Sequence, residues 1–427
     1  MYINKIKHIL LFFALTALVA CEAEIDQYTP DPGQANLTTF VAVGNSLVAG
    51  FADGDLYRSG QENSLANIIA GQLMHTGLGS FKQPLMKDEL GFGNRLVLAE
   101  VEGSLMPVPM PGTPDPANFA NIYQTEGPFH NLGVPLAKVS HLFFEGYGAL
   151  NPYYGRFASN PAASTVISDA AALDPTFFQL WIGHNDILGY ATSGGEGDGI
   201  TPAISFMTMY LMAVEIMTHN GAKGVLGNIA DITSIPFFQT VPYNALLLDD
   251  QNIVDLLNHA YSAAPHINFI LGPNPLVVAD NDHPAGLRQL EAGELVLLTA
   301  LGGIRNDGWG SQVPLPAQYY LNLDQIENIA GATDEYNQTI SMAAETFGLA
   351  YVDIRSVLAE AEHGIYFDAI GFNTEFVTGG VFSLDGIHLS ARGNAIVANE
   401  FIAAINRKYN ASIPKATIGS FPGIVFP

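Results

Sequence analysis

The stretch Thr38-Thr39-Phe40-Val41-Ala42-Val43-Gly44-Asn45-Ser46-Leu47-Val48-Ala49-Gly50 decides the fold of this chain. Its first half is a β-rich apolar run, which predicts a buried strand. Small and apolar residues follow the Gly-Asn-Ser-Leu turn and are able to open a helix, so Ser46 lies where a strand passes into a helix. In a parallel sheet this position is at the carboxyl edge, where backbone N–H groups face a ligand. Ser46 is therefore a candidate nucleophile, although a serine at such a turn is also a common helix cap.

A polar stretch near the other end of the chain supplies what a nucleophilic serine needs. It reads Phe382-Ser383-Leu384-Asp385-Gly386-Ile387-His388-Leu389-Ser390. An aspartate three residues before a histidine is able to hold one imidazole nitrogen while the other nitrogen faces a serine. The chain order Ser46, Asp385, His388 is compatible with a catalytic triad. By itself, an Asp-x-x-His segment is equally well explained as a solvated loop.

Strands and helices alternate between these two stretches. Apolar runs predict strands at Phe177–Ile182, 222–229 and 350–354. Apolar periodicity and capping residues predict helices over 61–75, from Thr201-Pro202 to about His219, and from Ser390 to about Arg407. This rhythm is typical of an α/β fold with a parallel sheet. The strand at Phe177–Ile182 runs into the polar tip Gly183-His184-Asn185-Asp186, which such a sheet places at its ligand-binding edge.

The size and charge of the chain limit the classes of function. Its 427 residues show no linker in the middle, which favours one large domain with insertions, expected near 80–128 and 236–330. Lys and Arg total 16 against 41 Asp and Glu, which gives a net charge of -25 at pH 7. Because phosphate binding needs the opposite sign, this composition argues against nucleic acid as a partner and against docking on a strongly anionic bilayer.

The first 36 residues have the pattern of an exported lipoprotein. Residues 1–20 combine a basic start with a short apolar run and predict a signal peptide. The run ends in Leu18-Val19-Ala20-Cys21, which resembles a bacterial lipobox with Cys21, the only cysteine, as the lipid acceptor. Residues 21–36 are acidic and rich in turn formers, and they predict a flexible tether. The expected location is the cell envelope, anchored to a bacterial membrane. An ordinary cleaved signal with an incidental cysteine is the alternative.

No segment calls for a metal ion or another cofactor. His184 is a single histidine in a turn, and Asp280-Asn281-Asp282-His283 lacks the spaced ligands and the glycine of a calcium loop. The glycine-rich run 194–199 lacks the Gly-Lys-Ser/Thr of a phosphate loop and carries two acids, which repel phosphate. We therefore expect neither a metal nor a nucleotide.

Four segments, taken in order, resemble the motif blocks of the SGNH, or GDSL-type, hydrolase family. The family's Gly-Asp-Ser-Leu block is matched by Gly44-Asn45-Ser46-Leu47, and its Gly-x-Asn-Asp block by the tip at 183–186. Its Asp-x-x-His block is matched at 385–388, and a glycine-bearing second block falls within His130–Lys138. The resemblance spans about residues 37–409, followed by a tail at 410–427. It implies a flavodoxin-like three-layer α/β/α sandwich with a parallel central sheet.

The resemblance also implies a role for each site residue. Ser46 is expected to be the nucleophile, His388 the general base and acid, and Asp385 the partner that orients the imidazole. The expected oxyanion hole comprises the Ser46 backbone N–H, the Asn185 side-chain amide and a backbone N–H of the second block, from either Gly133 or Leu136. Two positions depart from the family, because Asn45 stands where aspartate is usual and Leu136 where a second glycine is often found.

The expected function is hydrolysis of a carboxylic ester through an acyl-enzyme on Ser46. Lipid-like acyl esters and O-acetylated glycans both remain open as substrates. The alternative is a surface lipoprotein on the same fold that binds a glycan or another ligand without catalysis. The oligomeric state is left open.

Overall fold

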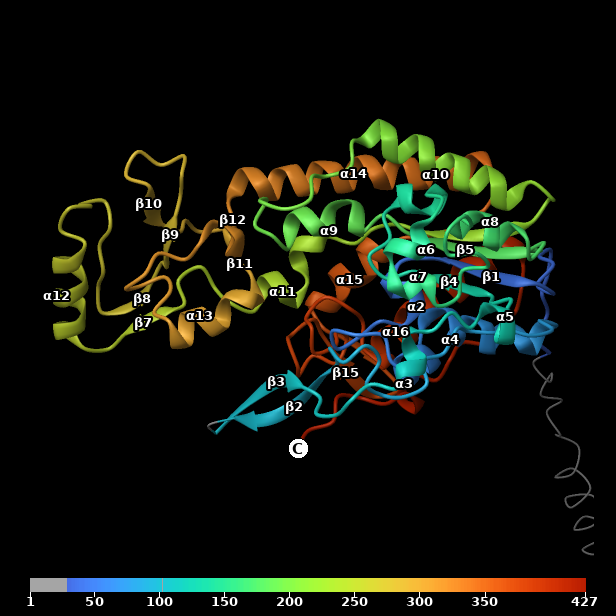
Figure 1. The fold of residues 1–427 in the computed structure, drawn as a ribbon, viewed down its shortest axis with the longest axis horizontal. Coiled ribbons are helices and arrows are strands. Elements are labelled where there is room, and N and C mark those ends of the chain that lie inside the picture. The colour runs from blue at the N-terminus through green and yellow to red at the C-terminus, as the bar shows by residue number, and fades with distance from the viewer. Residues whose placement is uncertain (1–28, 102) are drawn as a thin grey trace, which may run out of the picture. The chain divides into compact units, whose positions relative to one another are not determined.

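The computed structural model describes residues 29–101 and 103–427 and is built on one parallel β-sheet (Figure 1). The strands, in the order β13-β6-β5-β1-β4, are β1 (Phe40–Gly44), β4 (Asn131–Gly133), β5 (Phe177–Trp181), β6 (Lys223–Gly227) and β13 (Ala350–Val352). Gly44, the last residue of β1, pairs with Gly133 of β4 and with Trp181 of β5. The chain therefore leaves these three strands at one edge of the sheet, which brings three of the four sequence blocks together.

Helices cover both faces of the sheet and make the three-layer α/β/α sandwich that the sequence predicts (Figure 1). One face carries α8 (Val166–Ala171), α9 (Asn185–Ala191), α10 (Ala203–Thr218) and α14 (Leu323–Thr346), and the other carries α4 (Leu65–Leu73) and α16 (Ala391–Tyr409). The rings of Trp181 and Phe401 lie 5.7 Å apart and attach β5 to α16. On the opposite face, Phe206 of α10 stacks on Tyr336 of α14 at 3.9 Å. These buried aromatic contacts hold together the layers that carry the site.

Shorter elements connect these layers. Before β5 they are α2 (Ser46–Ala49), α3 (Arg58–Glu62), α5 (Tyr123–Glu126), α6 (Tyr147–Leu150), α7 (Pro152–Gly155) and the 3-10 helices η1 (Met74–Thr76), η2 (Pro116–Phe119) and η3 (Val139–Phe143). After β13 they are α15 (Ile354–Glu362), the hairpin of β14 (Ile365–Phe367) and β15 (Ile370–Phe372), and η7 (Ile418–Ser420). The excursion expected at 80–128 contains an antiparallel hairpin of β2 (Leu96–Val101) and β3 (Ser104–Pro109), which the sequence did not predict.

A long insertion between β6 and α14 forms an arm, defined here as residues 241–321 (Figure 1). The helices η4 (Ile232–Ser234) and α11 (Pro236–Gln239) lead into it. It contains β7 (Leu246–Leu248), α12 (Gln251–Ala260), β8 (Gly272–Asn274), β9 (Val277–Ala279), β10 (Leu287–Gln289), β11 (Leu295–Val296), η5 (Leu298–Ala300), α13 (Leu301–Asn306), η6 (Ala317–Tyr319) and β12 (Tyr320–Leu321). Two small hydrophobic clusters of its own stabilise it. The insertion expected at 236–330 ended too late, because α14 begins at Leu323 and packs on α10.

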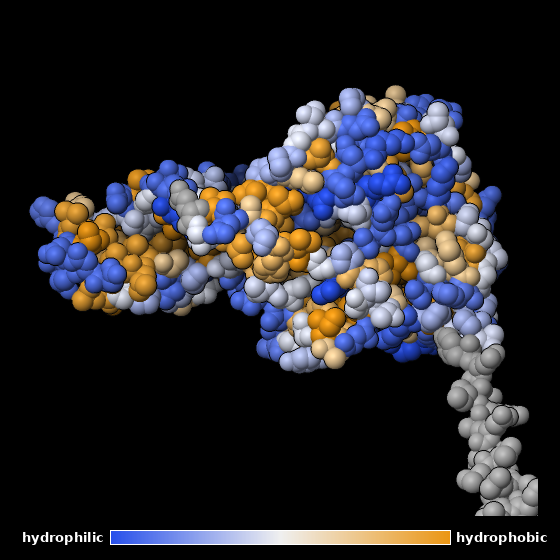
Figure 2. All heavy atoms as spheres, turned by 90° about the horizontal axis from the view of Figure 1, so that it is seen from below, coloured by the Kyte–Doolittle hydropathy of each residue, from blue (hydrophilic) through white to orange (hydrophobic). Residues whose placement is uncertain are grey.

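The surface of the arm is rich in exposed aliphatic side chains (Figure 2). The exposed members between β7 and β8 are Leu247, Ile253, Leu256, Ile270 and Leu271. The segment 241–287 contains no Lys or Arg, so this part of the arm is apolar and acidic.

The predicted strands at Phe177–Ile182, 222–229 and 350–354 are confirmed as β5, β6 and β13. The three predicted helices are confirmed as α4, α10 and α16. Strand β4 was missed, because three residues carry no periodicity and only their pairing with β1 makes them a strand. The predicted cap of α10 was wrong, since Pro202 occupies the N-cap position and the Thr201 N–H donates to the Asp186 carbonyl.

Both ends of residues 31–427, which form one unit, are tied to α16 or to the turn that follows it. Residues 31–36 were expected in the tether, yet the Asp31 N–H donates to Ser412 Oγ at 2.9 Å and the Gln34 N–H to the Tyr409 carbonyl at 2.7 Å. The tail expected at 410–427 also packs on the domain, since Ile413 is only 2% exposed. The predicted signal peptide and Cys21 lie outside the described residues. In the part of the chain that the structure describes, no helix has the length and apolar character needed to cross a membrane.

Candidate active site

Ser46 is the first residue of α2 and follows the N-cap residue Asn45. Asn45 Oδ1 accepts a hydrogen bond from the Leu47 N–H at 3.0 Å, which orders the turn. Ser46 is 6% exposed. Within residues 29–101 and 103–427, no acceptor is found for the Ser46 N–H. Asn45 therefore forms the turn as an aspartate would, and it leaves the N–H of Ser46 available to a ligand.

His388 and Asp385 lie in the loop before α16, and the structure brings both to Ser46. His388 Nε2 is 2.9 Å from Ser46 Oγ, and His388 Nδ1 is 2.9 Å from Asp385 Oδ2. Asp385 Oδ1 also accepts from the backbone N–H groups of Ile387 at 2.9 Å and His388 at 2.8 Å. Burial acts to raise the pKa of Asp385, but the charge and the hydrogen bonds of His388 outweigh burial and hold this pKa below its usual range. Asp385 is therefore anionic at neutral pH, so the proton of a neutral His388 lies on Nδ1 and Nε2 faces Ser46 as an acceptor.

The second block offers two backbone N–H groups, and only one of them is free. The Gly133 N–H donates to Asn131 Oδ1 at 2.9 Å. A Cβ at Gly133 would lie 2.3 Å from the Ala49 nitrogen, so glycine is needed there for the close approach of β4 to α2. Leu136 has a φ of +66°, the conformation that a glycine adopts readily, and its N–H has no acceptor among the described residues. The position where the family often has its second glycine thus keeps the glycine conformation while carrying a leucine.

The third block ties the start of α9 to the second-block loop. Asn185 Nδ2 donates to the Ala137 carbonyl at 3.0 Å, which fixes the orientation of the amide and leaves its second N–H free for a ligand. Asp186 Oδ2 accepts from the Val139 N–H at 2.9 Å. Burial raises the pKa of Asp186 to about 6, although the Val139 N–H acts in the opposite direction. The two neighbouring side chains therefore hold the loop around Leu136 at two points.

His184, which the sequence left without a role, is buried beside the site. Because Asn45 Oδ1 is engaged by Leu47, the Asn45 amide nitrogen faces His184 Nδ1 at 3.3 Å, and the proton of His184 lies on Nε2. Burial, followed by the neighbouring His388, lowers the pKa of His184 to about 3. Its ring packs edge-on with Trp181 at 5.1 Å. His184 is thus a neutral side chain, and no group of three metal-ligating residues occurs in the described part of the chain.

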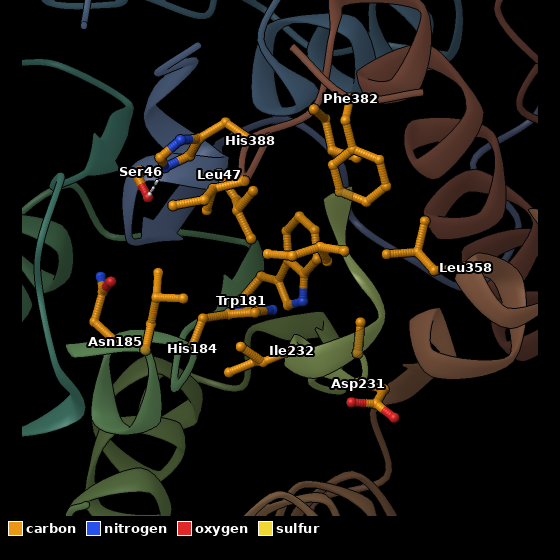
Figure 3. A pocket seen from close by; sticks show the side chains of 15 residues that line it. Ser46, Leu47, Trp181, His184, Asn185, Asp231, Ile232, Leu358, Phe382 and His388 are labelled. Carbon is orange, nitrogen blue, oxygen red and sulfur yellow. Dashed lines mark hydrogen bonds between the residues drawn. The ribbon is translucent and has the colours of Figure 1, made fainter. Parts of the chain in front are cut away.

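An apolar pocket of about 540 Å³, including its opening to solvent, lies beside Ser46 (Figure 3). Ser46 and His388 stand at one end of it and Leu358 at the other, with Trp181 between them. The remaining apolar lining residues are Leu47, Leu188, Ala230, Ile232, Ile235, Phe382, Ile387 and Leu389. A nucleophile at the mouth of an apolar pocket suits a substrate with a hydrocarbon part.

Several residues around the triad were missed by the sequence reasoning. The ring of Phe51 lies 4.6 Å from that of His388 and covers it. Gly54 donates its N–H to Asp385 Oδ2 at 2.9 Å, and the Ser383 hydroxyl donates to Asp385 Oδ1 at 3.1 Å. The available signal was the run Asp53-Gly54-Asp55, two carboxylates around a glycine directly after the nucleophile block.

One protein-family model matches most of this chain. The family model described as GDSL-like Lipase/Acylhydrolase matches residues 40–401. Among solved structures, a protein described as a GDSL-like lipase from Parabacteroides merdae is 12% identical, with 88% of this chain and 99% of that chain covered and a TM-score of 0.37. An acetylxylan esterase from Geobacillus stearothermophilus is 11% identical, with 87% and 96% covered and a TM-score of 0.37. No curated protein matches the chain significantly. The family assignment rests on the family model, because the structural similarities are remote.

Proposed function

This chain belongs to the GDSL-like lipase/acylhydrolase family, whose members are carboxylic ester hydrolases, and on that premise we propose that it works as a serine esterase with Ser46, His388 and Asp385 as its triad. The observation that carries the proposal is the continuous line of hydrogen bonds from Ser46 Oγ through the imidazole of His388 to Asp385. Nucleophile, base and orienting acid at these distances are what acyl transfer requires.

In the acylation half, Ser46 Oγ attacks the ester carbonyl carbon while His388 Nε2 takes the hydroxyl proton. A bond forms between Oγ and carbon, and the carbonyl oxygen becomes an oxyanion. The imidazolium, stabilised by Asp385, then gives its proton to the leaving alcohol as the old C–O bond breaks. In the second half, water attacks the acyl-enzyme with His388 again as the base. The acid is released, and the hydroxyl of Ser46 is restored.

Three N–H groups are proposed to bind the oxyanion: the backbone N–H groups of Ser46 and Leu136 and the free side-chain N–H of Asn185. The first two have no acceptor within the described residues, and the Asn185 amide is held by Ala137. Donors fixed in advance stabilise the developing charge without reorganisation, and loss of one typically lowers kcat by about 100- to 1000-fold. Leu136 is preferred to Gly133, because the N–H of Gly133 is already bonded to Asn131.

Replacement of the proposed nucleophile tests the mechanism. We expect Ser46→Ala and His388→Ala each to lower kcat for a chromogenic short-chain ester by about 1000-fold or more, with little change in thermal unfolding. Ser311→Ala, on the arm, serves as the control and should keep full activity. A fluorophosphonate should label the protein unless Ser46 is replaced. Full activity of Ser46→Ala would refute the mechanism, and an inactive native protein would favour a binding protein on the same fold.

The apolar pocket supports an ester with a hydrocarbon acyl chain as substrate, in preference to an acetylated glycan. We expect kcat/KM to rise from acetyl to hexanoyl p-nitrophenyl esters, because each buried methylene contributes up to about 0.8 kcal/mol. Leu358→Trp, at the far end of the pocket, should reduce activity toward the longer esters and spare the acetyl ester. Highest activity on the acetyl ester, unaffected by Leu358→Trp, would turn the proposal toward O-acetylated glycans.

We further propose that the protein is exported and held to a membrane by a lipid on Cys21. The support is the sequence of residues 1–21, a basic start and an apolar run that end in Leu18-Val19-Ala20-Cys21.

A further inference from the structure

A second aspartate lies behind Asp385, on the segment that follows the nucleophile. This segment donates hydrogen bonds to the loop of Asp385 and also accepts a hydrogen bond from it. The Asp53 N–H donates to Ser383 Oγ at 3.0 Å, and the Leu384 N–H donates to Asp53 Oδ1 at 2.9 Å. Gly54 and the Ser383 hydroxyl both donate to the carboxylate of Asp385. These bonds connect residues about 330 positions apart, and they tie the Ser46 segment to the segment that carries the base.

Asp53 is held in a conformation that costs free energy. Its φ is +51°, in the left-handed region that a residue with a side chain adopts only at a cost. Its second carboxylate oxygen accepts from the Tyr57 hydroxyl at 2.6 Å, so both oxygens are engaged. Strain of this kind persists where surrounding contacts fix the residue, and it often accompanies a functional site.

Three charged or titratable groups face Asp53. They are Asp385 in the loop before α16, Tyr57 in the turn before α3, and Arg95, which directly precedes β2. The Arg95 guanidinium stacks on the Tyr57 ring at 3.6 Å and pairs with Glu89 at 2.6 Å, and its positive charge acts to lower the pKa of Asp53. Burial raises the pKa of Asp53, and Asp385 adds to that effect, while the hydrogen bonds of Tyr57 and Leu384 oppose it. Both oxygens of Asp53 accept hydrogen bonds, from the Leu384 N–H and the Tyr57 hydroxyl, as those of a carboxylate do, and these bonds favour the charged form.

We propose that Asp53 is a positioning residue, a second carboxylate that fixes Asp385 against the nucleophile segment and adds negative potential behind His388. The inference rests on the proposed roles of Ser46 and His388. The charge of His388 rises by one unit when it takes the proton of Ser46, so a nearby fixed anion stabilises the transition state more than the ground state. Asp53 acts through Asp385 and touches neither the substrate nor the reacting atoms.

Asp53→Asn removes the negative charge of residue 53 but keeps its hydrogen bond, because the amide oxygen of asparagine still accepts from the Leu384 N–H. Without the anion, the protonated imidazole is less favoured, so the acid limb of kcat/KM should move to lower pH by about half a unit. The plateau of kcat should fall by about three- to tenfold while KM stays the same. A purely structural role would lower activity without moving the limb.

Two variants serve as matched controls. Asp55 is also buried on this segment, but its carboxylate accepts from the backbone of Leu56, Phe92 and Asn94, away from Asp385. Asp55→Asn should therefore leave the acid limb in place, whatever it does to stability. Tyr57→Phe removes one hydrogen bond and retains the charge of Asp53, so it too should leave the limb in place.

Arg95→Gln keeps the test decisive if Asp53→Asn does not fold. It removes a positive charge near Asp53 and should move the limb to higher pH. An unmoved limb in Asp53→Asn, an equal movement in Tyr57→Phe, or an unmoved limb in Arg95→Gln would each overturn the inference. Residual full activity of Ser46→Ala would instead overturn the proposed mechanism, so the two failures are distinguishable.

Discussion

The second block has two positions where the family often carries glycine, Gly133 and Leu136, and a different physical constraint acts at each. Gly133 has no room for a side chain, because the backbone of α2 lies against it. Leu136 has ample room, since its side chain is 66% exposed, but its backbone is in the left-handed region. Space limits the first position and backbone conformation limits the second.

Substitution at these two positions should therefore have opposite effects on stability. Gly133→Ala forces a Cβ into the backbone of α2 and should lower the free energy of unfolding by about 1–3 kcal/mol. Leu136→Gly relieves the left-handed strain and loses little packing, so it should raise the free energy of unfolding by about 0.5–1 kcal/mol and preserve kcat. Denaturant titration and ester hydrolysis measure both effects.

Asp174→Gly is a suitable reference, because Asp174 is also exposed and has a φ of +47°. It should give a similar gain in stability. If Leu136→Gly lost the activity that Asp174→Gly kept, the leucine side chain itself would take part in substrate binding.

At the level of residues, the motif blocks of the sequence predicted which polar side chains gather at the candidate site. Ser46, Asp385, His388 and Asn185 all lie where the blocks placed them. It could not predict that Gly133 already uses its N–H or that Asp53 bonds to the Asp385 loop. Both facts depend on contacts between segments far apart in the chain.

At the level of elements, α9 and the loop before η3 are joined by the buried Asp186. Its bond to the Val139 N–H holds the loop that presents Leu136. Its other oxygen, Oδ1, accepts no hydrogen bond of good geometry among the described residues, and burial raises its pKa more than the nearby Thr201 side chain and Lys138 charge lower it. A buried carboxylate with one poorly bonded oxygen disfavours ionisation, which agrees with its pKa of about 6.

The raised pKa of Asp186 makes stability fall as pH rises. The native state binds this proton more tightly than the unfolded state, so the contribution is full below about pH 3.9 and is lost as the pH passes about 6. The free energy of unfolding should therefore lose about 2–3 kcal/mol from this group between pH 4 and pH 7. Asp186→Asn should abolish that part of the pH dependence, as measured by urea unfolding at several pH values.

Asp353→Asn is an informative comparison, because Asp353 is a carboxylate that also bonds to its neighbours, Asn228 and Ser356, but its burial is outweighed by these hydrogen bonds, which hold its pKa below the usual range. It should leave the slope between pH 4 and pH 7 in place. An unchanged slope in Asp186→Asn would show that Asp186 is not the group that titrates.

The elements that the sequence predicted well are the long apolar ones. Strand β5 is marked in the sequence by a run of apolar residues, and helix α16 by its capping residue Ser390. Both elements were predicted. The strands of the arm are two or three residues long and are defined by their pairing, so no local pattern marks them. Length alone did not decide the difference, since β13 is also three residues long and was predicted from the apolar run at 350–354.

At the scale of the whole molecule, much of the arm forms a side unit. Tyr243 and Leu276 are joined by a backbone hydrogen bond of 2.9 Å, so the part that contains β7, α12 and β8 begins and ends at one place. The base of the arm is different, because Leu298 packs near Gly386 in the loop of the triad. The exposed aliphatic residues lie on the outer part, and the contact with the site is made by the base.

The proposed lipid anchor is tested on the full-length precursor. Cys21→Ser should move the protein from the membrane fraction to the soluble fraction, or block its processing, because no other cysteine exists in the sequence. Ser46→Ala is the matched control and should still sediment with membranes, although it is inactive. Sedimentation of Cys21→Ser with membranes would refute the anchor.

The hydrogen bond between Ser46 and His388 joins residues 342 positions apart, and this separation has a consequence for folding in time. The entropy cost of joining residues so far apart is lower once the parallel strands between them have paired, so we expect this contact to form late. Helices, which need only local contacts, regain their signal early during refolding. The return of ester hydrolysis should accompany the last step, when the C-terminal segment docks on the nascent sheet. A chain cut before Ser383 lacks the proposed base His388, so removal of the C-terminal segment by proteolysis should abolish ester hydrolysis.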